Sequence, residues 1–280
     1  MPKISIITIN FNDQVGLEKT YNSVVNQSNK DFEYIIIDGG SSDGSKEFIE
    51  KNSYKFSYWI SEKDSGVYNA MNKGIKVAKG DYLLFLNSRD FLIDNTIIDK
   101  VLKSINTNFD IYYGNLLYSL NDINTQLWSP PSTLSFSYFL SDSLPHPSSL
   151  IKRELFSKHF LYSENLKIVS DWEFFIYCIC KMNVSYKHLD FTISNFDNSG
   201  MSSVKDNETK INLEKEQVLK KHFPLFIDDV KILENGNSKR FKEFQAIKKS
   251  IFKSTLLKGF MSLLLLFQPK IMIKRYITKL

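Results

Sequence analysis

The chain has 280 residues and a net charge of +5, and 42% of its residues are hydrophobic while 24% are charged. This balance excludes a disordered or fibrous chain and leaves room for one large core, with or without a small appendage. No apolar run reaches the roughly 18 to 20 residues that span a bilayer, and the chain begins without a signal-peptide pattern, so we expect a cytoplasmic protein. Cys178 and Cys180 fall on different sides of one expected helix, which argues against a disulfide.

The positive charge is concentrated at the end of the chain. Residues 244–280 contain eight Lys or Arg residues and no acid, so the rest of the chain carries −3, the total of +5 less these eight. Binding of nucleic acid is therefore not indicated. In this tail the apolar run 259–267 lies between Lys258 and Lys270, which favours a helix on the surface of an anionic membrane. Packing on the domain, or on a second subunit of a homodimer, is the alternative.

The first half of the chain alternates between strand and helix patterns. Strands are predicted at 3–10, 32–37, 56–60, 82–86 and 110–114, and amphipathic helices at 14–27, around 48–49, at 67–78 and at 95–105. Short right-handed connections between such elements predict an α/β fold, in which a mainly parallel sheet is flanked by helices. Asn69 and Asn72 fall on the polar face of their helix, where we expect them to be solvated.

The second half of the chain is less regular. Several prolines between residues 127 and 147 predict loops that line a site, and residues 152–160 predict a short helix. Ser170 and Glu173 match a capping box at the start of a strongly apolar helix. A strand at 184–193 and a polar loop at 195–202 are expected next, and the chain is helical and charged beyond residue 205.

The strand at 82–86 is apolar throughout, as expected for a strand that is buried on both faces. Ligands of open α/β sheets bind beyond the carboxyl ends of the strands, and Asn87, Ser88 and Asp90 follow this strand. Their oxygen atoms are of the kind that holds Mg²⁺ or Mn²⁺ against a diphosphate. A turn that caps the next helix is the alternative interpretation.

Six segments in order resemble the signatures of one enzyme family. They are residues 5–12 (SIITINFN), 37–44 (IDGGSSDG), 62–74 (EKDSGVYNAMNKG), 80–90 (GDYLLFLNSRD), 145–149 (PHPSS) and 170–173 (SDWE). The set resembles bacterial family 2 glycosyltransferases, especially the colanic-acid-type branch that builds surface polysaccharides, over roughly residues 3 to 203. The resemblance implies a GT-A fold, a nucleotide-sugar donor, a divalent metal ion and inversion at the anomeric carbon.

The resemblance also implies roles for residues at the ends of the first strands. Thr8, Ile9 and Asn10 would border the nucleobase, largely through backbone atoms. Asp38 would accept a hydrogen bond from a uracil ring, so the expected donor is a UDP-sugar, and Asp64 would lie near the nucleotide.

Asn87 and Asp90 match the family's metal motif, with Ser88 between them. The family commonly has Asp where Asn87 stands, and an acid or glycine where Arg89 stands. With fewer carboxylates, Asp90 becomes the main candidate ligand for Mn²⁺ or Mg²⁺. Arg89 would instead hold a phosphate oxygen.

Asp171 matches the family's catalytic base, which takes the proton from the attacking acceptor hydroxyl. The alternative is a carboxylate that only stabilises the start of its helix. His146 would contact the acceptor or the diphosphate, or else serve the structure alone. We expect Asp90 and Asp171 to face one cavity from opposite ends.

The leading hypothesis is an inverting glycosyltransferase that adds a sugar to a polyprenyl-diphosphate-linked oligosaccharide at the cytoplasmic face of the membrane. Residues 1–204 would form the GT-A domain, with a nucleotide-sugar half at 1–115 and an acceptor half at 116–204. Residues 205–280 would form a helical extension that associates with the membrane or with a second subunit. The alternative hypothesis is a catalytically silent scaffold that binds nucleotide, which the altered metal motif suggests.

Overall fold

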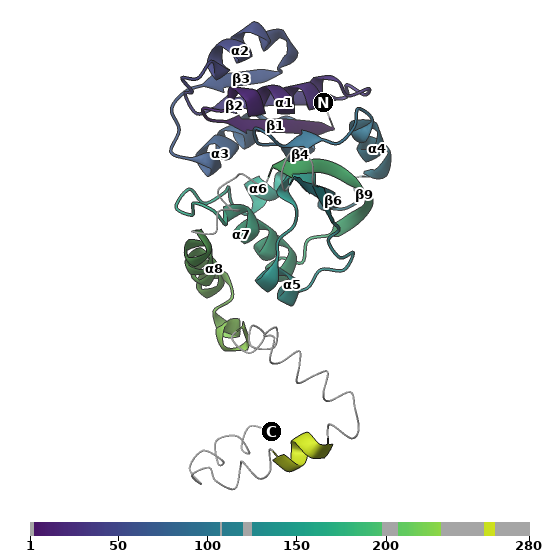
Figure 1. Ribbon diagram of the computed structural model, residues 1–280, viewed down its shortest axis with the longest axis vertical. Coiled ribbons are helices and arrows are strands. Elements are labelled where there is room, and N and C mark those ends of the chain that lie inside the picture. Colours follow the sequence, from purple (N-terminus) through teal and green to yellow (C-terminus); the bar gives the residue numbers. More distant parts are fainter. Residues whose placement is uncertain (1–2, 107, 120–124, 198–206, 231–254, 261–280) are drawn as a thin grey trace. The chain divides into compact units, whose positions relative to one another are not determined.

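The computed structural model in Figure 1 describes residues 3–106, 108–119, 125–197, 207–230 and 255–260. The chain divides into two compact units, Met1–Pro224 and Leu225–Leu280, and the first holds all the elements named below except the last turn. In the second unit residues 255–260 are helical, and the rest of the predicted basic tail lies outside the described residues. Within the described parts of the chain, no helix combines the length and the apolar character that crossing a membrane requires.

The strands of the first unit are β1 (Ile4–Asn10), β2 (Phe32–Asp38), β3 (Tyr58–Ser61), β4 (Tyr82–Phe85), β5 (Phe91–Leu92), β6 (Ile111–Ser119), β7 (Thr125–Trp128), β8 (Ser149–Lys152) and β9 (Tyr186–Asp197). The helices are α1 (Gln14–Val25), α2 (Ser45–Lys51), α3 (Val67–Val77), α4 (Ile97–Ser104), α5 (Phe136–Ser141), α6 (Glu154–Lys158), α7 (Ser170–Ile176) and α8 (Glu208–His222). Short 3₁₀ turns occupy Ser53–Lys55, His146–Ser148 and Pro224–Phe226, and a π-helical turn at Tyr177–Lys181 extends α7.

The nine strands form one sheet in the order β3-β2-β1-β4-β8-β6-β9-β5, and β7 pairs with β6 outside this path. β3, β2, β1 and β4 are parallel, as are β6 and β9, whereas β8 runs antiparallel to both β4 and β6. The predicted α/β class with a mainly parallel sheet flanked by helices is therefore confirmed. Figure 1 shows the first strands and their helices at one end of this unit and α5 and α7 beyond β4.

Alternate residues of β1 and β2 pack on opposite faces of the sheet, so every residue of β1 is buried, and so is every residue of β2 after Phe32. On one face, Ile6 and Ile36 belong to a core cluster with Leu17 of α1. On the other face, Ile7 and Ile37 lie against α3, where a Cβ on Gly74 would come within 2.6 Å of the Ile7 side chain.

The connection from α3 into β4 passes directly over β1. A Cβ on Gly80 would lie 2.5 Å from the backbone nitrogen of Ser5, so a larger residue does not fit there. The buried carboxylate of Glu33 accepts hydrogen bonds from Ser5 Oγ at 2.5 Å and from the Gly80 N–H at 2.9 Å. These contacts fix the start of β4, whose other end leads into residues 87–90.

Several expected element boundaries are wrong. Residue 152, expected to begin a short helix, ends β8, and the helix α6 begins at Glu154. Residues 195–197 of the expected polar loop belong to β9, while residues 198–202 lie outside the described part. The expected loops at 127–146 include the end of β7 and the helix α5. Asn72, expected to be solvated, is 3% exposed. Its amide nitrogen donates to the Tyr162 carbonyl at 2.9 Å, and its amide oxygen accepts the Tyr162 N–H at 3.0 Å.

Candidate active site

Polar side chains gather where β1, β2 and β3 end. Asn10 and Asp38 are register partners on neighbouring strands, and Asn10 Nδ2 donates to Asp38 Oδ1 at 2.7 Å. The buried Asp38 carboxylate also accepts hydrogen bonds from Ser41 Oγ and from Ser61 Oγ, each at 2.6 Å. Burial acts to raise the pKa of Asp38, but the hydrogen bonds from Ser41, Ser61 and Asn10 outweigh it and leave the pKa below its usual value. We call Asn10, Asp38, Ser41 and Ser61 the strand-end cluster.

Both oxygens of Asp38 are engaged within the protein, because the backbone N–H groups of Gly40 and Ser41 donate to Oδ2 as well. A hydrogen bond from a uracil ring would therefore have to share or replace one of these donors. The predicted role of Asp38 in nucleobase binding stays a prediction.

The other residues expected near the nucleobase lie at different depths. Thr8 is fully buried, with Oγ1 3.1 Å from the Tyr34 hydroxyl, and Ile9 is 7% exposed. Because these side chains are buried, a contact with the nucleobase would use backbone atoms, and this role stays a prediction. Asp64 lies beside the Asp38 turn, since a Cβ on Gly39 would meet its Oδ2 at 2.7 Å.

The loop after β4 is tied to the strand-end cluster through Ser88. Ser88 Oγ donates to Asn10 Oδ1 at 2.6 Å, and the Ser88 N–H donates to the Ile9 carbonyl at 3.0 Å. The structure thus brings together the predicted residues Ile9, Asn10, Asp38 and Ser88 at one edge of the sheet.

Arg89 follows with a positive φ of 79°, a backbone conformation that costs a non-glycine residue on the order of 1 kcal/mol. Its guanidinium makes two hydrogen bonds with Asp13, the N-cap residue of α1, at 2.7 and 3.1 Å. Hydrogen bonding and charge from Asp13 raise the pKa of Arg89 further. The group expected to hold a phosphate is engaged by this carboxylate.

Asp90 is 3% exposed, and its carboxylate accepts hydrogen bonds from the N–H groups of Asn87 and Asp197, each at 3.3 Å. Burial raises the pKa of Asp90 to about 8, since these backbone hydrogen bonds offset only part of the desolvation. At neutral pH the carboxyl group is therefore mainly protonated unless a cation displaces the proton.

The residues around Asp90 fit a divalent cation in part. Asp90 and Asn87 line a hollow of 390 Å³, and the Asn87 Oδ1 is buried without a hydrogen-bond partner. Among the residues that the structure describes, no group of three or more His, Cys, Asp or Glu side chains converges on one point. Mg²⁺ and Mn²⁺ sites often use one or two protein oxygens and take the rest from phosphate and water, so this partial set suits a cation that arrives with a diphosphate.

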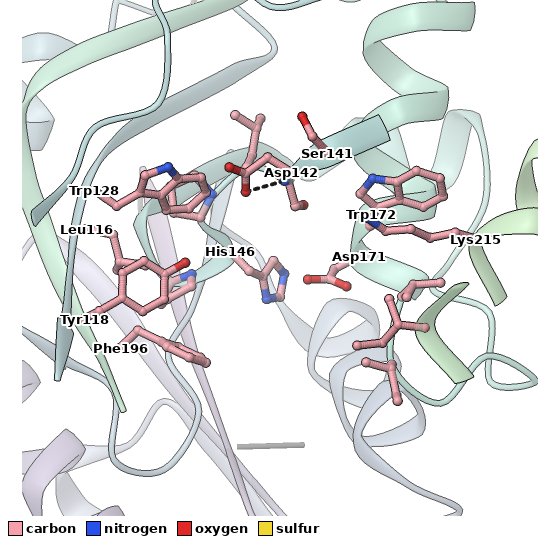
Figure 2. A pocket seen from close by; sticks show the side chains of 17 residues that line it. Leu116, Tyr118, Trp128, Ser141, Asp142, His146, Asp171, Trp172, Phe196 and Lys215 are labelled. Carbon is pink, nitrogen blue, oxygen red and sulfur yellow. Dashed lines mark hydrogen bonds between the residues drawn. The ribbon is translucent and has the colours of Figure 1, made fainter. Parts of the chain in front are cut away.

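Asp171 lies in the first turn of α7 and lines a different pocket, of 310 Å³, which we call the Asp171 pocket (Figure 2). The Tyr68 hydroxyl lies 2.9 Å from Asp171 Oδ1 and 2.6 Å from the Ile168 carbonyl, and it accepts the Ser170 N–H at 3.0 Å. Tyr68 therefore connects α3 to the start of α7, and its one proton is shared between the Ile168 carbonyl and one oxygen of the Asp171 carboxylate.

His146 lines the same pocket, and Figure 2 shows the Asp171 carboxylate pointing toward its ring. The ring stacks on Phe85 of β4 with centroids 4.8 Å apart, and Nε2 lies 2.9 Å from the Tyr162 hydroxyl. Burial lowers the pKa of His146, although the charge of Asp171 acts in the opposite direction. At neutral pH this imidazole is therefore uncharged.

The expected single cavity for Asp90 and Asp171 is not present in the described structure. Asp90 lines the hollow beside the β4 loop, Asp171 lines the Asp171 pocket, and Phe196 at the end of β9 lines both. The two hollows are therefore adjacent, with the Phe196 side chain between them. Phe196 lies there as part of β9, where the sequence predicted a polar loop.

The expected capping box at the start of α7 is wrong. Ser170 is a residue of the helix, and its Oγ accepts the Ser163 N–H, while Glu173 is bound by His222 Nε2 at 2.7 Å and Lys221 Nζ at 2.8 Å.

A residue from α8, not Glu173, binds the backbone N–H groups at the start of α7. The buried carboxylate of Glu214 accepts the N–H groups of Lys167, Ile168 and Val169 at 2.8, 3.0 and 3.2 Å. The backbone before Asp171 is thus held by α8, which belongs to the same compact unit as the sheet.

Trp128, Asp142 and Ser143 also line the Asp171 pocket, and they come from the segment 127–147 that the sequence predicted would line a site, although it singled out none of them. Sequence reasoning missed the pocket residues Tyr118, Phe196 and Lys215. No motif marks these six residues, since they come from β6, β7, β9, α8 and the segment between α5 and the 3₁₀ turn of His146. Trp172, expected either in the core or against an acceptor, is 3% exposed, donates Nε1–H to the Phe139 carbonyl at 2.7 Å and also borders the pocket.

Comparison with known proteins places these features in a family. The chain matches the family described as Glycosyl transferase family 2 over residues 5–166. It is 32% identical over 183 residues to an uncharacterized glycosyltransferase of Mycobacterium tuberculosis, covering 62% of this chain and 68% of that protein. It is also 32% identical over 121 residues to the GalNAc(5)-diNAcBac-PP-undecaprenol beta-1,3-glucosyltransferase of Campylobacter jejuni, covering 42% of this chain and 39% of that enzyme.

Two solved structures share the fold at low sequence identity. S. aureus TarS 1-349 in complex with UDP has a TM-score of 0.58 and 19% identity, covering 70% of this chain and 60% of TarS 1-349. The mannosyltransferase PcManGT of Pyrobaculum calidifontis, in complex with GDP-Man and Mn²⁺, has a TM-score of 0.57 and 13% identity, covering 94% of this chain and 81% of that protein. These likenesses confirm the GT-A fold. Together with the family match over more than half of its length, they lead to one conclusion: this chain belongs to glycosyl transferase family 2.

Proposed function

We propose that this glycosyltransferase moves a sugar, with inversion, from a UDP-sugar to a hydroxyl group of an oligosaccharide carried on a lipid diphosphate during surface polysaccharide assembly. The observation that carries the proposal is the Asp171 carboxylate, which borders a pocket of 310 Å³ with one oxygen hydrogen-bonded by Tyr68. The Campylobacter jejuni relative is named for an undecaprenol-linked acceptor, and TarS 1-349 was solved with UDP, which supports these choices of acceptor and donor.

The reaction needs one base on the acceptor side. As the acceptor hydroxyl oxygen forms a bond to the anomeric carbon, its proton passes to Asp171. The bond between the anomeric carbon and the phosphate oxygen breaks, and its electron pair leaves with the nucleoside diphosphate. Tyr68 binds Oδ1, so Oδ2 is the oxygen available for the proton. The neutral His146 beside it can hold the acceptor by a hydrogen bond.

The strand-end cluster and the β4 loop would receive the nucleotide. Asp38, Asp64 and the backbone of residues 8–10 would border the base and ribose. Asp90 and Asn87 would hold Mn²⁺ or Mg²⁺, which when bound neutralises charge on the leaving diphosphate. Arg89 would contact a phosphate oxygen by giving up one of its two hydrogen bonds with Asp13.

The proposal is tested by adding UDP-sugars and Mn²⁺ to purified protein with polyprenyl-diphosphate-linked acceptors, and following both transfer and UDP release. Transfer that Asp171→Asn abolishes while UDP binding persists is the expected result. The absence of both nucleotide binding and transfer with every UDP- and GDP-sugar would overturn the proposal.

A second candidate function is a scaffold that binds nucleotide without transferring sugar. The observation that favours it is the metal motif, in which Asp90 is buried with a raised pKa and the neighbouring positions hold Asn87 and Arg89. Tight UDP binding by calorimetry, with no transfer and no effect of Asp171→Asn on any activity, would select this candidate.

We further propose that the protein acts at the cytoplasmic face of the membrane, through its basic tail at 244–280. Co-sedimentation with vesicles that contain anionic lipid, compared with neutral vesicles, tests this location. A protein that stays in the supernatant and forms a dimer in solution would instead favour subunit packing of the tail.

A further inference from the structure

The Asp171 pocket contains a cation from a helix that none of the family motifs includes. Lys215 of α8 reaches the pocket beside Trp172, with its Nζ 4.9 Å from the centre of the indole ring. Figure 2 shows the side chain extending from α8 past Trp172 toward Asp171. The family match ends at residue 166, so α8 lies beyond it.

The Lys215 ammonium lacks an ion-pair partner among the described residues. Every ion pair there within 4.0 Å involves other groups, and the carboxylates of Asp142 and Asp171 act on Lys215 only from a greater distance. Burial lowers the pKa of Lys215, which indicates that the ammonium has lost water without gaining a close carboxylate. A donor of this kind is available for a ligand.

The backbone of α8 is held firmly where Lys215 projects from it. The adjacent Glu214 binds three consecutive N–H groups at 167–169, immediately before the Asp171 helix. Further along α8, Lys221 and His222 bind Glu173, which lies with Asp171 in the first turn of α7. Lys215 is therefore positioned relative to Asp171 by contacts on either side of it.

Other polar groups and aromatic rings of the pocket suit a sugar. Ser143 Oγ is buried and has no hydrogen-bond partner, and Asp142 is exposed beside it. Figure 2 shows the rings of Tyr118, Trp128 and Phe196 on the side of the pocket opposite Asp171. Aromatic faces and a few convergent polar groups are the usual lining of a sugar-sized site.

The charges of the pocket select among sugars. Among the described residues that line it, Asp142 and Asp171 contribute two negative charges, Lys215 one positive charge, and His146 is neutral, so the pocket carries a net charge of −1. A carboxylate or phosphate on the bound sugar would meet net repulsion, whereas neutral hydroxyl groups can accept from the ammonium and donate to the carboxylates.

We propose that Lys215 is an acceptor-binding residue, and that the pocket which it completes takes an uncharged sugar and discriminates against one that carries a carboxylate or a phosphate. This inference rests on the proposed function, because it takes the occupant of the Asp171 pocket to be the acceptor. Lys215 donates hydrogen bonds to hydroxyl oxygens of this sugar, and Asp171 receives the proton of the attacking hydroxyl.

The first experiment measures steady-state transfer with Lys215→Met, Lys215→Arg and the control Lys220→Met, whose side chain is exposed and pairs with Glu216 on the same helix. Lys215→Met should raise the acceptor KM about tenfold, as expected for losing a hydrogen bond from a charged donor, while the donor KM changes less than about twofold. Lys215→Arg should restore most of the acceptor affinity, and Lys220→Met should resemble the wild type. An unchanged acceptor KM in Lys215→Met overturns the assignment, and so does an equal loss in Lys220→Met.

The second experiment does not require transfer, so it separates this inference from the proposed function. Trp128 and Trp172 line the pocket, so their fluorescence should change when a sugar binds there. The protein is titrated with neutral methyl hexopyranosides and with the matched methyl hexuronides, and binding is followed by the quenching of this fluorescence. We expect the neutral sugars to bind about tenfold more tightly, and Lys215→Met to weaken them by a similar factor. Equal or tighter binding of the hexuronides, no effect of Lys215→Met, or no binding of either class would each overturn the proposal, whether or not sugar transfer is observed.

Discussion

The strand-end cluster and the Asp171 pocket are held in contrasting ways. In the cluster, every polar side chain is paired with a neighbour on an adjacent strand or turn, and Asp38 alone accepts from Asn10, Ser41 and Ser61. In the pocket, Ser143 Oγ has no hydrogen-bond partner, and the Lys215 ammonium has no carboxylate within 4.0 Å among the described residues. One region is therefore ordered by its own hydrogen bonds, while the other keeps polar groups available for a ligand.

The difference indicates how the two halves of the reaction are prepared. Parallel strands in register place the donor-side residues together whether or not a ligand is bound. The acceptor side depends on α7, α8 and β9 meeting from distant parts of the chain, with Glu214 and Tyr68 as the connecting groups. Substitutions should accordingly affect stability more in the cluster and activity more in the pocket.

The largest effect is expected for Asp171→Asn. The amide cannot accept the acceptor proton but keeps the size of the side chain and can still pair with Tyr68, so kcat should fall by about 10³-fold or more while the fold is retained. Transfer assays at saturating donor and acceptor measure the loss, and UDP affinity by calorimetry serves as the control. Retention of more than a tenth of the activity would show that another group takes the proton.

Asp38→Asn should be the most destabilising of the conservative changes. The amide nitrogen cannot accept hydrogen bonds, so at least one of the donors from Asn10, Ser41 or Ser61 loses its partner inside the sheet edge. We expect the free energy of unfolding to fall by about 2 to 4 kcal/mol. Urea unfolding followed by circular dichroism measures this change. A loss below about 1 kcal/mol would contradict the idea that the cluster is ordered by its own hydrogen bonds.

The pKa of Asp90 gives the next prediction. Its folded-state pKa of about 8 exceeds the ordinary value of 3.8, so the folded protein holds a proton that the unfolded chain releases between these two values. Stability should therefore decrease as the pH rises from about 4 to 8 and then level off. Asp90→Asn, which resembles the protonated acid, should remove this dependence and stabilise the protein at pH 9 by on the order of a few kcal/mol without metal.

Unfolding midpoints at pH 5, 7 and 9, measured in EDTA, test the Asp90 prediction. Added Mn²⁺ should raise the wild-type midpoint more at pH 9 than at pH 5, because the metal ion competes with the proton for the same carboxylate, and it should have no such effect on Asp90→Asn. A wild-type profile that is flat across this range would mean that Asp90 is ionised in the folded protein.

Glu214→Gln makes the same chemical change as Asp38→Asn, but on the acceptor side. The amide oxygen can still accept from the N–H groups before Asp171, so the stability loss should stay near 1 to 2 kcal/mol. The weaker hold on residues 167–169 should nevertheless lower kcat about tenfold, with the donor KM unchanged. A larger loss of stability than in Asp38→Asn, with kcat intact, would reverse the contrast between the two regions.

The sequence predicts a region well when the residues that form it are close together along the chain, and poorly when they are far apart. β1, β2 and β4 are short apolar runs whose polar ends are visible in the sequence, so the parallel core and the residues Asn10, Asp38 and Ser88 could be located by pattern. Ser170 and Glu173 have the spacing of a capping box, yet Glu214, more than 40 residues away, binds the backbone ahead of α7 instead.

The acceptor side escapes prediction for the same reason. Lys215 and Asp142 carry no motif, and their proximity depends on how α8 packs on α7, which spacing does not encode. β9 also continues through Phe196 because it pairs with β6, although its sequence there is as polar as a loop. As a result, Asp90 and Asp171 lie in neighbouring hollows, where the sequence suggested one cavity.

The smallest effect is expected for Arg89, in the loop after β4 that leads to Asp90. Its side chain is paired with Asp13, like the side chains of the strand-end cluster, but it is 47% exposed and so accessible to a ligand. If its guanidinium moves from Asp13 to a phosphate when nucleotide binds, Arg89→Ala should weaken UDP binding about tenfold or less, which is the usual value of one charge-assisted contact. Asp13→Asn, which weakens the competing pair, should leave UDP affinity unchanged or improve it. Isothermal titration of both variants separates the roles, since equal weakening by Asp13→Asn would mean that Arg89 serves only to fasten the β4 loop to α1.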